Sequence, residues 1–332
     1  MRENSVYYLM RPGLIERCRD TLGAVGDDFV EVRYLYSGIC GSDVAKFRGD
    51  SPVTFPFSIG HEFVAVVEAM GANVDGMSVG LAITSDFNYR CEMCDHCEEG
   101  RTHLCREGQV ARFTNRAFSQ RAQINQRYLV PIGETPDIKF VLSEPLSCAL
   151  HALAWAKPQP NDRILVVGAG GIGLCVCFAL VNQYRTPFDV TDLIDGRLKA
   201  LEPLVSPLGR VTSNLAEEYD VVLDVSGTAS GLESACRRVR AGGKVCSMSH
   251  LDPFMGTTFL LEMLTRRDIS FKMSYLNGQR SNLTDAISLL DVYWTPKWLR
   301  TLTVHPIEEI HAEFRGRQFS PYCKSVISAP ED

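Results

Sequence analysis

Residues 163–173 have the sequence RILVVGAGGIG, an apolar run that leads directly into a cluster of glycines. The arrangement G-x-G-x-x-G between a predicted strand and a predicted helix is typical of a dinucleotide-binding turn. Gly168 permits a tight turn, Gly170 lets the backbone approach a pyrophosphate, and Gly173 lets the helix pack closely against the strand. The N-terminus of that helix attracts negative charge. The stretch therefore predicts one strand–turn–helix unit of a doubly wound parallel sheet.

Asp192 ends the next predicted strand, 24 residues after Gly168. A carboxylate at about this spacing binds the hydroxyl groups of the adenosine ribose, and it would repel the 2′-phosphate of NADP. We therefore predict NAD as the cofactor, with Arg197, the nearest cation, flanking either the adenine or the protein surface. A glycine-rich corner that binds no ligand is the alternative. The cofactor-binding residues predicted from this region are Gly168, Gly170, Gly171, Ile172, Gly173, Asp192 and Arg197.

The pattern of predicted elements changes at residues 158–162, PQPND. Up to about residue 140 the chain has short alternating segments, such as residues 30–36, between connections that contain Gly or Pro, which predicts a mostly β region. After residue 162 strands alternate with helices, which predicts an α/β region. The strands predicted there lie near residues 163–167, 188–192, 209–212, 219–225, 243–248 and 268–275.

Length and composition are those of a globular protein of about two domains. The chain has 332 residues, of which 45% are hydrophobic and 22% charged, and these values exclude the disordered and fibrous classes. The net charge is −6, from 34 basic and 40 acidic residues. Because no dense block of Lys and Arg accompanies this acidic balance, we expect no nucleic acid and no membrane surface as a partner.

The N-terminal residues 1–5, MRENS, lack the basic and apolar stretches of a signal peptide. The window from Ile164 to Val181 has 18 residues without a charge, but its glycines divide it into a strand and a helix start, so we expect no membrane span. A cytoplasmic location is therefore expected. In such a chain, 12 cysteines indicate metal ligands or buried thiols before disulfides.

Four cysteines follow the spacing C-x2-C-x2-C-x7-C, at Cys91, Cys94, Cys97 and Cys105. Tight turns between closely spaced cysteines can bring four thiolates around a tetrahedral zinc ion. An iron–sulfur cluster is the alternative, but it expects a much shorter gap to the fourth cysteine and then a proline. We predict a structural zinc in a lobe of about residues 86–110. His96 and His103 lie in this lobe and are expected to be solvated.

A second set of metal-binding side chains lies in three separate segments: Cys40 in residues 38–43, His61 and Glu62 after Gly60, and Glu144 in residues 143–146. A thiol, an imidazole and a carboxylate form an open site that leaves room for water or substrate, as a catalytic zinc requires. Taken alone, Cys40 would be an ordinary buried cysteine and His61 a structural histidine.

Together, and in this order, these motifs resemble the zinc-containing medium-chain dehydrogenase/reductase family. The resemblance covers nearly the whole chain: the Cys40 segment, Gly60-His61-Glu62, the four-cysteine lobe, Glu144-Pro145-Leu146, the glycine turn, Asp192, residues 220–224 with Gly227, and residues 242–245. It implies an α/β protein with a GroES-like β-barrel catalytic domain over residues 1–143 and a doubly wound Rossmann NAD-binding domain over 144–281. Residues 282–332 would return to pack on the catalytic domain, and the substrate would bind between the domains.

The family resemblance also implies roles for individual residues. Cys40, His61 and Glu144 would bind a catalytic zinc, with Glu62 as a neighbour that can exchange onto the metal, so that each chain holds two zinc ions. A glutamate in Glu-Pro-Leu as the third ligand, in place of cysteine, is similar to the polyol, sugar and threonine dehydrogenase branch. Ser42 would accept the proton of the alcohol while zinc acts as a Lewis acid. A turn serine that caps its own backbone is the alternative for Ser42.

Ala45 departs from the family pattern, because many relatives carry at this position a histidine that passes the substrate proton to solvent. Alanine cannot transfer a proton, so either water reaches Ser42 or a substrate hydroxyl completes the path. This favours a polar substrate with several hydroxyl groups. We therefore predict a zinc- and NAD-dependent oxidoreductase that acts on a secondary alcohol or ketone of a polyol, cyclitol, aminocyclitol or sugar derivative.

Other functions stay open at this point: a threonine-type amino-alcohol dehydrogenase, a sugar-phosphate dehydrogenase, a biosynthetic ketone reductase, or a non-catalytic binding or sensor protein. The intact set of Cys40, His61 and Glu144 argues against the last. Relatives commonly pair through the edge of the Rossmann sheet, so a homodimer or homotetramer is expected.

Further histidines, cations and cysteines lie outside these motifs. His250 is a candidate nicotinamide contact, and His151 a packing residue at the domain junction. Lys46, Arg48 and Arg112 could meet a phosphate or carboxylate, although such cations are usually solvated. The remaining cysteines, at 18, 148, 175, 177, 236, 246 and 323, are expected to be core thiols.

Overall fold

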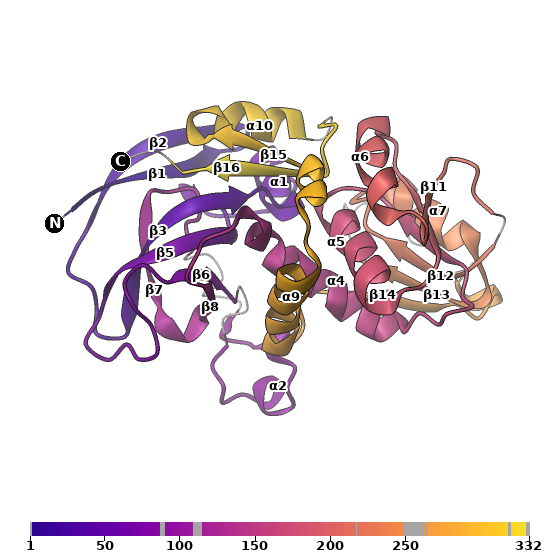
Figure 1. Ribbon diagram of the computed structural model, residues 1–332, viewed down its shortest axis with the longest axis horizontal. Coiled ribbons are helices and arrows are strands. Elements are labelled where there is room, and N and C mark those ends of the chain that lie inside the picture. Colours follow the sequence, from indigo (N-terminus) through magenta and orange to yellow (C-terminus); the bar gives the residue numbers. More distant parts are fainter. Residues whose placement is uncertain are drawn as a thin grey trace.

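The computed structural model describes residues 2–86, 90–108, 115–216, 218–248, 262, 264–317 and 320–329. The described strands form sheets of three, six and seven strands. Figure 1 shows the six-stranded sheet at one end of the molecule and the other sheets at the opposite end, where both chain termini lie. Helices α4 (Ser143–Ala156), α5 (Gly171–Ala179) and α9 (Arg280–Tyr293) lie between the two ends.

The six-stranded sheet is parallel and has the order β11-β10-β9-β12-β13-β14. Strand β9 (Ile164–Val167), which precedes the glycine turn, pairs with β10 on one side and with β12 on the other. This is the order of a doubly wound sheet, so the predicted fold class is confirmed. The other strands are β10 (Phe188–Thr191), β11 (Gly209–Val211), β12 (Tyr219–Asp224), β13 (Val239–Ser247) and β14 (Ser270–Met273).

Strand β9 is buried on both faces, as its apolar sequence requires. Ile164 and Val166 belong to a core cluster that also holds apolar residues of α5 and of α6 (Asp195–Val205). Leu165 and Val167 belong to a second cluster, with residues of α7 (Ala229–Arg238). Successive side chains of a strand point to opposite faces, so helices cover both sides of the sheet.

Each glycine of the turn occupies its position for a different structural reason. Gly168 has a φ of +110°, which favours glycine. A Cβ at Gly173 would lie against the carbonyl oxygen of Gly168, closer than van der Waals contact allows, so only glycine lets α5 approach β9 this closely. A Cβ at Gly170 would meet no atom nearer than 4.0 Å, which leaves the backbone there open.

The seven-stranded sheet has the order β15-β16-β3-β5-β6-β8, with β7 beside β3. Its pairs are antiparallel except for β15 and β16, which run parallel. The three-stranded sheet β2-β1-β4 joins it through bonds such as that from the Tyr7 N–H to the Phe118 carbonyl, 2.9 Å. The strands of both sheets are β1 (Arg2–Arg11), β2 (Leu14–Leu22), β3 (Phe29–Gly38), β4 (Phe57–Ser58), β5 (Glu62–Met70), β6 (Ala82–Ser85), β7 (Arg121–Asn125), β8 (Leu129–Gly133), β15 (Leu302–Pro306) and β16 (Lys324–Ser328).

The end of the chain returns to this antiparallel side of the molecule. Strand β16 pairs with β3, placing Val326 opposite Gly38. Helix α10 (Ile310–Gly316) buries Ile310 and Phe314 in a cluster with residues of β1 and of α1 (Gly41–Arg48). In Figure 1 these C-terminal elements lie beside β1 and β2, so they are distant from the N-terminal strands in the sequence but next to them in space.

One core cluster is continuous between the two ends. It includes Val64 and Ala82 of the antiparallel sheet, much of α4, and Ile164 of the parallel sheet. Trp298 packs edge-on against Phe178 of α5, with ring centroids 5.0 Å apart. The two ends are therefore held together by buried apolar contacts around α4, α5 and α9.

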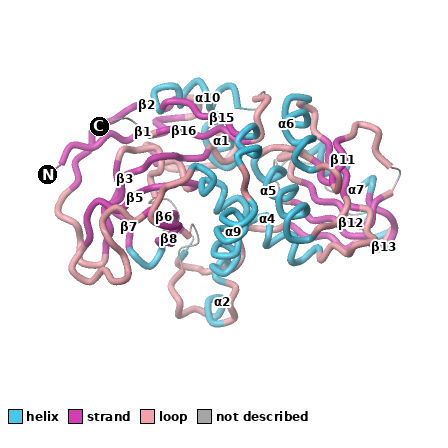
Figure 2. The backbone as a smooth tube through the Cα atoms, in the orientation of Figure 1, coloured by secondary structure: helices cyan, strands magenta, loops and turns pink. Residues whose placement is uncertain are grey.

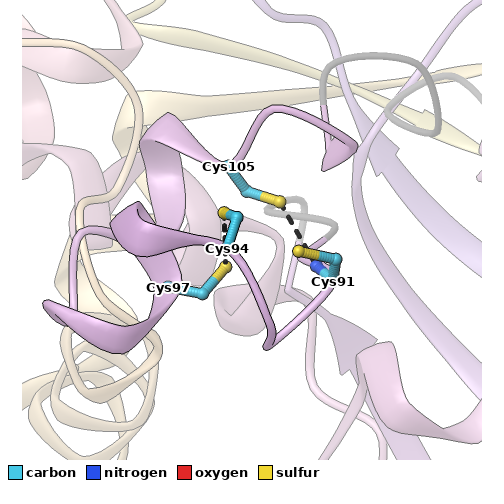
Figure 3. A group of neighbouring side chains, drawn as sticks. All are labelled: Cys91, Cys94, Cys97 and Cys105. Atoms are coloured by element: carbon cyan, nitrogen blue, oxygen red, sulfur yellow. Dashed lines mark hydrogen bonds between the residues drawn. The ribbon is translucent and has the colours of Figure 1, made fainter.

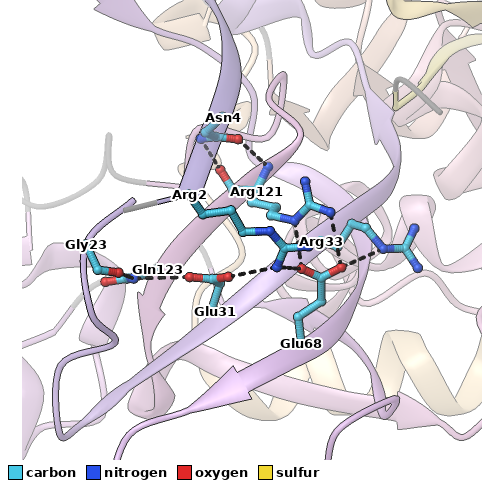
Figure 4. A network of polar contacts seen from close by, with 8 residues as sticks. All are labelled: Arg2, Asn4, Gly23, Glu31, Arg33, Glu68, Arg121 and Gln123. Carbon is cyan, nitrogen blue, oxygen red and sulfur yellow. Dashed lines mark hydrogen bonds and ion pairs between the residues drawn. The ribbon is translucent and has the colours of Figure 1, made fainter. Parts of the chain in front are cut away.

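A polar network fastens the N-terminal strand to the antiparallel sheet (Figure 4). The carboxylate of Glu68 accepts bonds from Arg2 at 2.9 Å, from Arg33 at 2.9 Å and from Arg121 at 2.7 Å. The side chain of Asn4 donates to the carbonyl of Arg121, 2.9 Å. These contacts tie β1 to β3, β5 and β7.

Residues 91–108 form a lobe with little regular structure, which contains the short helix α2 (Asp95–Glu98) and projects from the antiparallel side (Figure 2). Its Thr102 hydroxyl donates to the Gly278 carbonyl at 3.3 Å, just before α9. The lobe therefore contacts the parallel-sheet half through this loop. Among the described residues no helix has the length and apolarity needed to cross a membrane.

Candidate active site

The four cysteines of the lobe point toward one another in the structure (Figure 3). Their sulfur atoms all lie within 4.8 Å of one another, and the sulfurs of Cys94 and Cys97 are 3.6 Å apart. Thiolates at about 2.3 Å from a tetrahedral zinc lie about 3.8 Å from each other, so this arrangement fits the ion. Backbone N–H groups of Cys91 and Gly108 donate to the sulfur of Cys105, at 3.2 and 3.3 Å. Such donors favour the thiolate, which is the form that binds metal.

Neither histidine of the lobe is fully exposed to solvent, because His96 and His103 are both half-buried. His103 packs against His151 of α4, with ring centroids 5.0 Å apart, and both rings are half-buried. The expectation that His103 is solvated is therefore wrong, because the lobe lies against α4 and the loop at Gly278. Burial, and then the positive charges of Lys272 and His103, lower the pKa of His151 to about 4.

A second metal-binding group combines Cys40, His61 and Glu62, whose ligand atoms lie within 4.8 Å of one another. Cys40 is the N-cap residue of α1, and His61 immediately precedes β5. The chain turns sharply between them at Gly60, which has a φ of +95° and lies against Phe118. Residues from two segments of the sequence, the start of α1 and the start of β5, therefore meet at this group.

Asp43, in the first turn of α1, faces the imidazole of His61. Its Oδ2 lies 3.6 Å from Nδ1 of His61, and its exposed fraction is only 2%. Burial lowers the pKa of His61, but the charges of Asp43 and then Cys40 outweigh burial and raise it to about 10. The side chains around the imidazole thus carry an excess of negative charge, which suits a bound cation. The thiol, imidazole and carboxylate set also fits zinc in its chemistry.

Lys324 forms a buried ion pair with Glu62, and neither side chain is more than 2% exposed. The Lys324 ammonium also donates to the Ile39 carbonyl, next to Cys40, at 3.1 Å. A Cβ at Gly171 would come within 3.1 Å of the Lys324 side chain. One cation from β16 therefore lies between the metal-binding group and the glycine turn.

Glu144 lies beside this group, in the first turn of α4, and is buried. It is not within the set of mutually close ligand atoms; one of its oxygens instead accepts a bond from the Cys148 thiol, at 3.3 Å. Burial raises the pKa of Glu144, whereas the charge of His61 lowers it, so the two side chains are near enough to interact. The ligand set of Cys40, His61 and Glu144, with Glu62 as a neighbour, stays a prediction. Cys148 lies at the site and not in the core, contrary to expectation.

Ser42 is half-buried in the first turn of α1, two residues after Cys40. In the described part of the chain its hydroxyl makes no hydrogen bond, so it does not cap its own backbone. Lys46 lies one turn later with only 9% of its surface exposed, and its ammonium donates to the Ser42 carbonyl at 3.2 Å. Lys46 is therefore not a solvated cation, whereas Arg48 is exposed. Arg112 and His250 lie outside the described residues.

Asp192 is positioned by the glycine turn itself. Its carboxylate accepts bonds from the backbone N–H of Ala169 at 2.6 Å and of Ile194 at 2.8 Å. Arg197 lies 3.5 Å from the same carboxylate and donates to the Ser320 carbonyl at 3.1 Å. Arg197 thus connects the cofactor-binding region to the segment that precedes β16, a contact that its sequence position did not predict.

Comparison with known proteins gives matches to dehydrogenases. The family model of the alcohol dehydrogenase GroES-like domain matches residues 26–134. The sorbitol dehydrogenase of Halalkalibacterium halodurans is 30% identical over 241 residues, which are 66% of this chain and 68% of that protein. The L-threonine 3-dehydrogenase of Aliivibrio fischeri strain MJ11 is 28% identical over 244 residues, 67% of this chain and 69% of that protein.

Solved structures share the complete fold. The rspB alcohol dehydrogenase of Escherichia coli CFT073, solved with NADH, has a TM-score of 0.85 at 21% identity and covers 99% of this chain and 100% of its own. Galactitol-1-phosphate dehydrogenase from Escherichia coli has a TM-score of 0.81 at 18% identity, covering 98% and 99% of the two chains. The two sheets are therefore a GroES-like domain and a Rossmann domain, as the resemblance implies. The chain belongs to the zinc-type alcohol dehydrogenases of the medium-chain dehydrogenase/reductase family, in the polyol-type branch.

Proposed function

We propose that this alcohol dehydrogenase uses zinc and NAD to interconvert a secondary alcohol and its ketone in a polyol, cyclitol, aminocyclitol or sugar derivative. The observation that carries the proposal is the position of Lys324, which pairs with Glu62 and also lies against Gly171 of the glycine turn. The metal-binding group and the cofactor-binding turn are therefore adjacent, as transfer between a substrate and a dinucleotide requires.

The two zinc ions and NAD would each be bound by specific residues of the chain. Cys40, His61 and Glu144 would hold the catalytic zinc, with Glu62 beside them, and the four-cysteine lobe would hold a structural zinc. The glycine turn and Asp192 would hold NAD, with the Asp192 carboxylate favouring it over NADP. When bound, zinc supplies Lewis-acid stabilisation to an alcohol oxygen, and NAD accepts a hydride.

Ser42 is the residue that would accept the proton of the alcohol. Its hydroxyl is half-buried next to Cys40 and is not used by its own backbone in the described residues. A side chain that passes the proton on must carry a titratable or hydroxyl group, and Ala45 carries neither. Water or a substrate hydroxyl would therefore continue the path, which favours a polar substrate.

An anionic polyol, such as a sugar phosphate or a sugar acid, is a second candidate substrate. Lys46 supports it, because this buried ammonium lies one helical turn from Ser42 and over the ring of Phe57, 5.8 Å from its centroid. An ammonium is a common partner for phosphate and carboxylate groups. Threonine is a further candidate substrate, because a threonine-type amino-alcohol dehydrogenase would use the same fold.

NAD reduction measured across a panel of polyols, inositols, aminocyclitols, sugar phosphates, sugar acids and threonine tests the proposal. We expect turnover with at least one hydroxyl-rich class, loss of turnover in Cys40→Ser, and much slower turnover in Ser42→Ala. A preference for small hydrophobic alcohols, or unchanged turnover in Cys40→Ser, would contradict it.

We also infer the division of the chain and its assembly. Residues 1–143 and 282–332 would form the catalytic domain and 144–281 the cofactor domain, which is supported by the pairing of β15 and β16 with the β3 sheet. A homodimer or homotetramer is supported by β14, which ends the parallel sheet in the described residues and exposes 44% of Met273.

A further inference from the structure

Cys148 and Glu144 lie on successive turns of α4 and contact each other through their side chains. The Cys148 thiol donates to Oε1 of Glu144 at 3.3 Å. Residues four apart on a helix lie on the same face, so the contact is built into the helix and needs no loop to form it. A thiol S–H is a weak hydrogen-bond donor, and here a carboxylate oxygen of Glu144 is its acceptor.

A second observation places Cys148 at the metal-binding group. Helix α4, which carries Cys148, packs against β5, the strand that begins at Glu62. Cys148 is also half-buried, whereas six other cysteines are fully buried: Cys105, Cys175, Cys177, Cys236, Cys246 and Cys323. Apolar packing therefore does not explain its position.

We propose that Cys148 is a positioning residue, whose thiol holds one oxygen of Glu144 and so prepares the carboxylate to bind the catalytic metal. This inference rests on the proposed zinc site. Carboxylates that bind metals are themselves hydrogen-bonded, and removal of such a partner typically lowers metal affinity about 10- to 100-fold. In this chain the partner is a thiol supplied by the same helix.

The two carboxylates at the site are restrained in different ways. Glu62 is held by Lys324, whose positive charge compensates its negative charge in a buried ion pair. Glu144 is held by an uncharged, weak donor, so its negative charge stays available to a cation. The thiol thus fixes the direction of Glu144 without neutralising it. This difference favours Glu144 over Glu62 as the anionic ligand, although Glu62 lies closer to Cys40 and His61.

Metal retention in variants of Cys148 tests the proposal. Cys148→Ala removes the donor, Cys148→Ser keeps a hydroxyl donor, and Cys236→Ala serves as a matched control because it removes a buried thiol from α7, away from the site. Each zinc-loaded protein is titrated with a chelator, and the metal content and kcat are measured. We expect Cys148→Ala to lose one zinc ion at about 10- to 100-fold lower chelator concentration, and the other two variants to behave like the wild type.

A cobalt spectrum separates positioning from direct ligation. Cobalt(II) is exchanged into the catalytic site while metal analysis shows that zinc stays in the lobe. We expect Cys148→Ser to keep the thiolate-to-cobalt absorption of the wild type, because Cys40 alone supplies it.

Three results would overturn the inference. Equal metal retention in the wild type and Cys148→Ala would show that the thiol does not position Glu144. Loss of part of the thiolate-to-cobalt absorption in Cys148→Ser would make Cys148 a ligand and not a positioning residue. A wild-type chain that binds metal only in the lobe would overturn the proposed function together with this inference.

Discussion

At the scale of single residues, the site depends on side chains that orient the proposed ligands. Asp43, Lys324 and Cys148 contact His61, Glu62 and Glu144 respectively. Asp43 and Cys148 could have been found from the local sequence. Asp43 forms the capping box of α1 together with Cys40, and Cys148 lies one helical turn after Glu144 on α4. Lys324 could not, because it is 262 residues away from Glu62 in the sequence. Motif spacing finds ligands but does not find such distant partners.

Replacement of Asp43 by Asn tests the orientation of His61. The substitution keeps the shape of the side chain and removes the charge that faces Nδ1 of His61. Loss of a carboxylate behind a metal-binding imidazole typically costs about 10- to 100-fold in metal affinity or activity. We expect kcat and the retention of the catalytic metal to fall within this range, while the circular dichroism spectrum is unchanged. Full activity in Asp43→Asn would show that the contact has no functional role.

At the scale of elements, the parallel-sheet half was the more predictable one. Its glycine turn, strand and helix follow one another in sequence, so β9, α5 and the strand before Asp192 could be predicted from local patterns. The antiparallel half depends on pairings between distant segments, such as β16 with β3, which no local pattern specifies. The contact of the cysteine lobe with the loop at Gly278 was missed for the same reason, and with it the burial of His103.

Gly173→Ala tests the packing of α5 on β9. A methyl group there would collide with the backbone of Gly168, which cannot move without opening the turn. Overpacking of this kind costs about 1–3 kcal/mol. We expect a loss of this size in the free energy of unfolding in urea and weaker NAD binding by calorimetry. Gly23→Ala is the control, because a Cβ at Gly23 meets no atom within 4 Å. Equal stability of the two variants would argue against the close packing of α5 on β9 at Gly173.

At the scale of the whole molecule, we expect acid to destabilise the contact between the lobe and the Rossmann half. The pKa of His151 is lowered to about 4, compared with about 6.5 in an unfolded chain. Between these values the unfolded chain binds the proton and the folded chain does not, so the contribution of His151 to stability is lost as pH falls from 6.5 to 4.

His151→Asn is expected to reduce this pH dependence. Unfolding in urea of zinc-loaded protein at pH 7 and pH 5 measures it, and the wild type should lose more stability between the two values than the variant. Because other groups that titrate in this range are common to both proteins, the difference isolates His151. Parallel losses in the two proteins would show that the junction does not exclude the charged imidazole.

In the proposed function one chain holds two metal sites, one closed and one open, beside an NAD-binding turn. The four cysteines are close enough for a closed site, and Cys40, His61 and Glu62 form the second group. The same chain shares the fold of a solved alcohol dehydrogenase over 99% of its length.

The most direct test is the zinc content of the purified protein, measured for the wild type and Cys40→Ser together with NADH formation on the best polyol of the panel. We predict two zinc ions per chain and NAD-dependent turnover in the wild type, and one zinc ion and no turnover in Cys40→Ser with NAD binding retained. One zinc ion in both proteins, or turnover that survives in Cys40→Ser, would contradict the account.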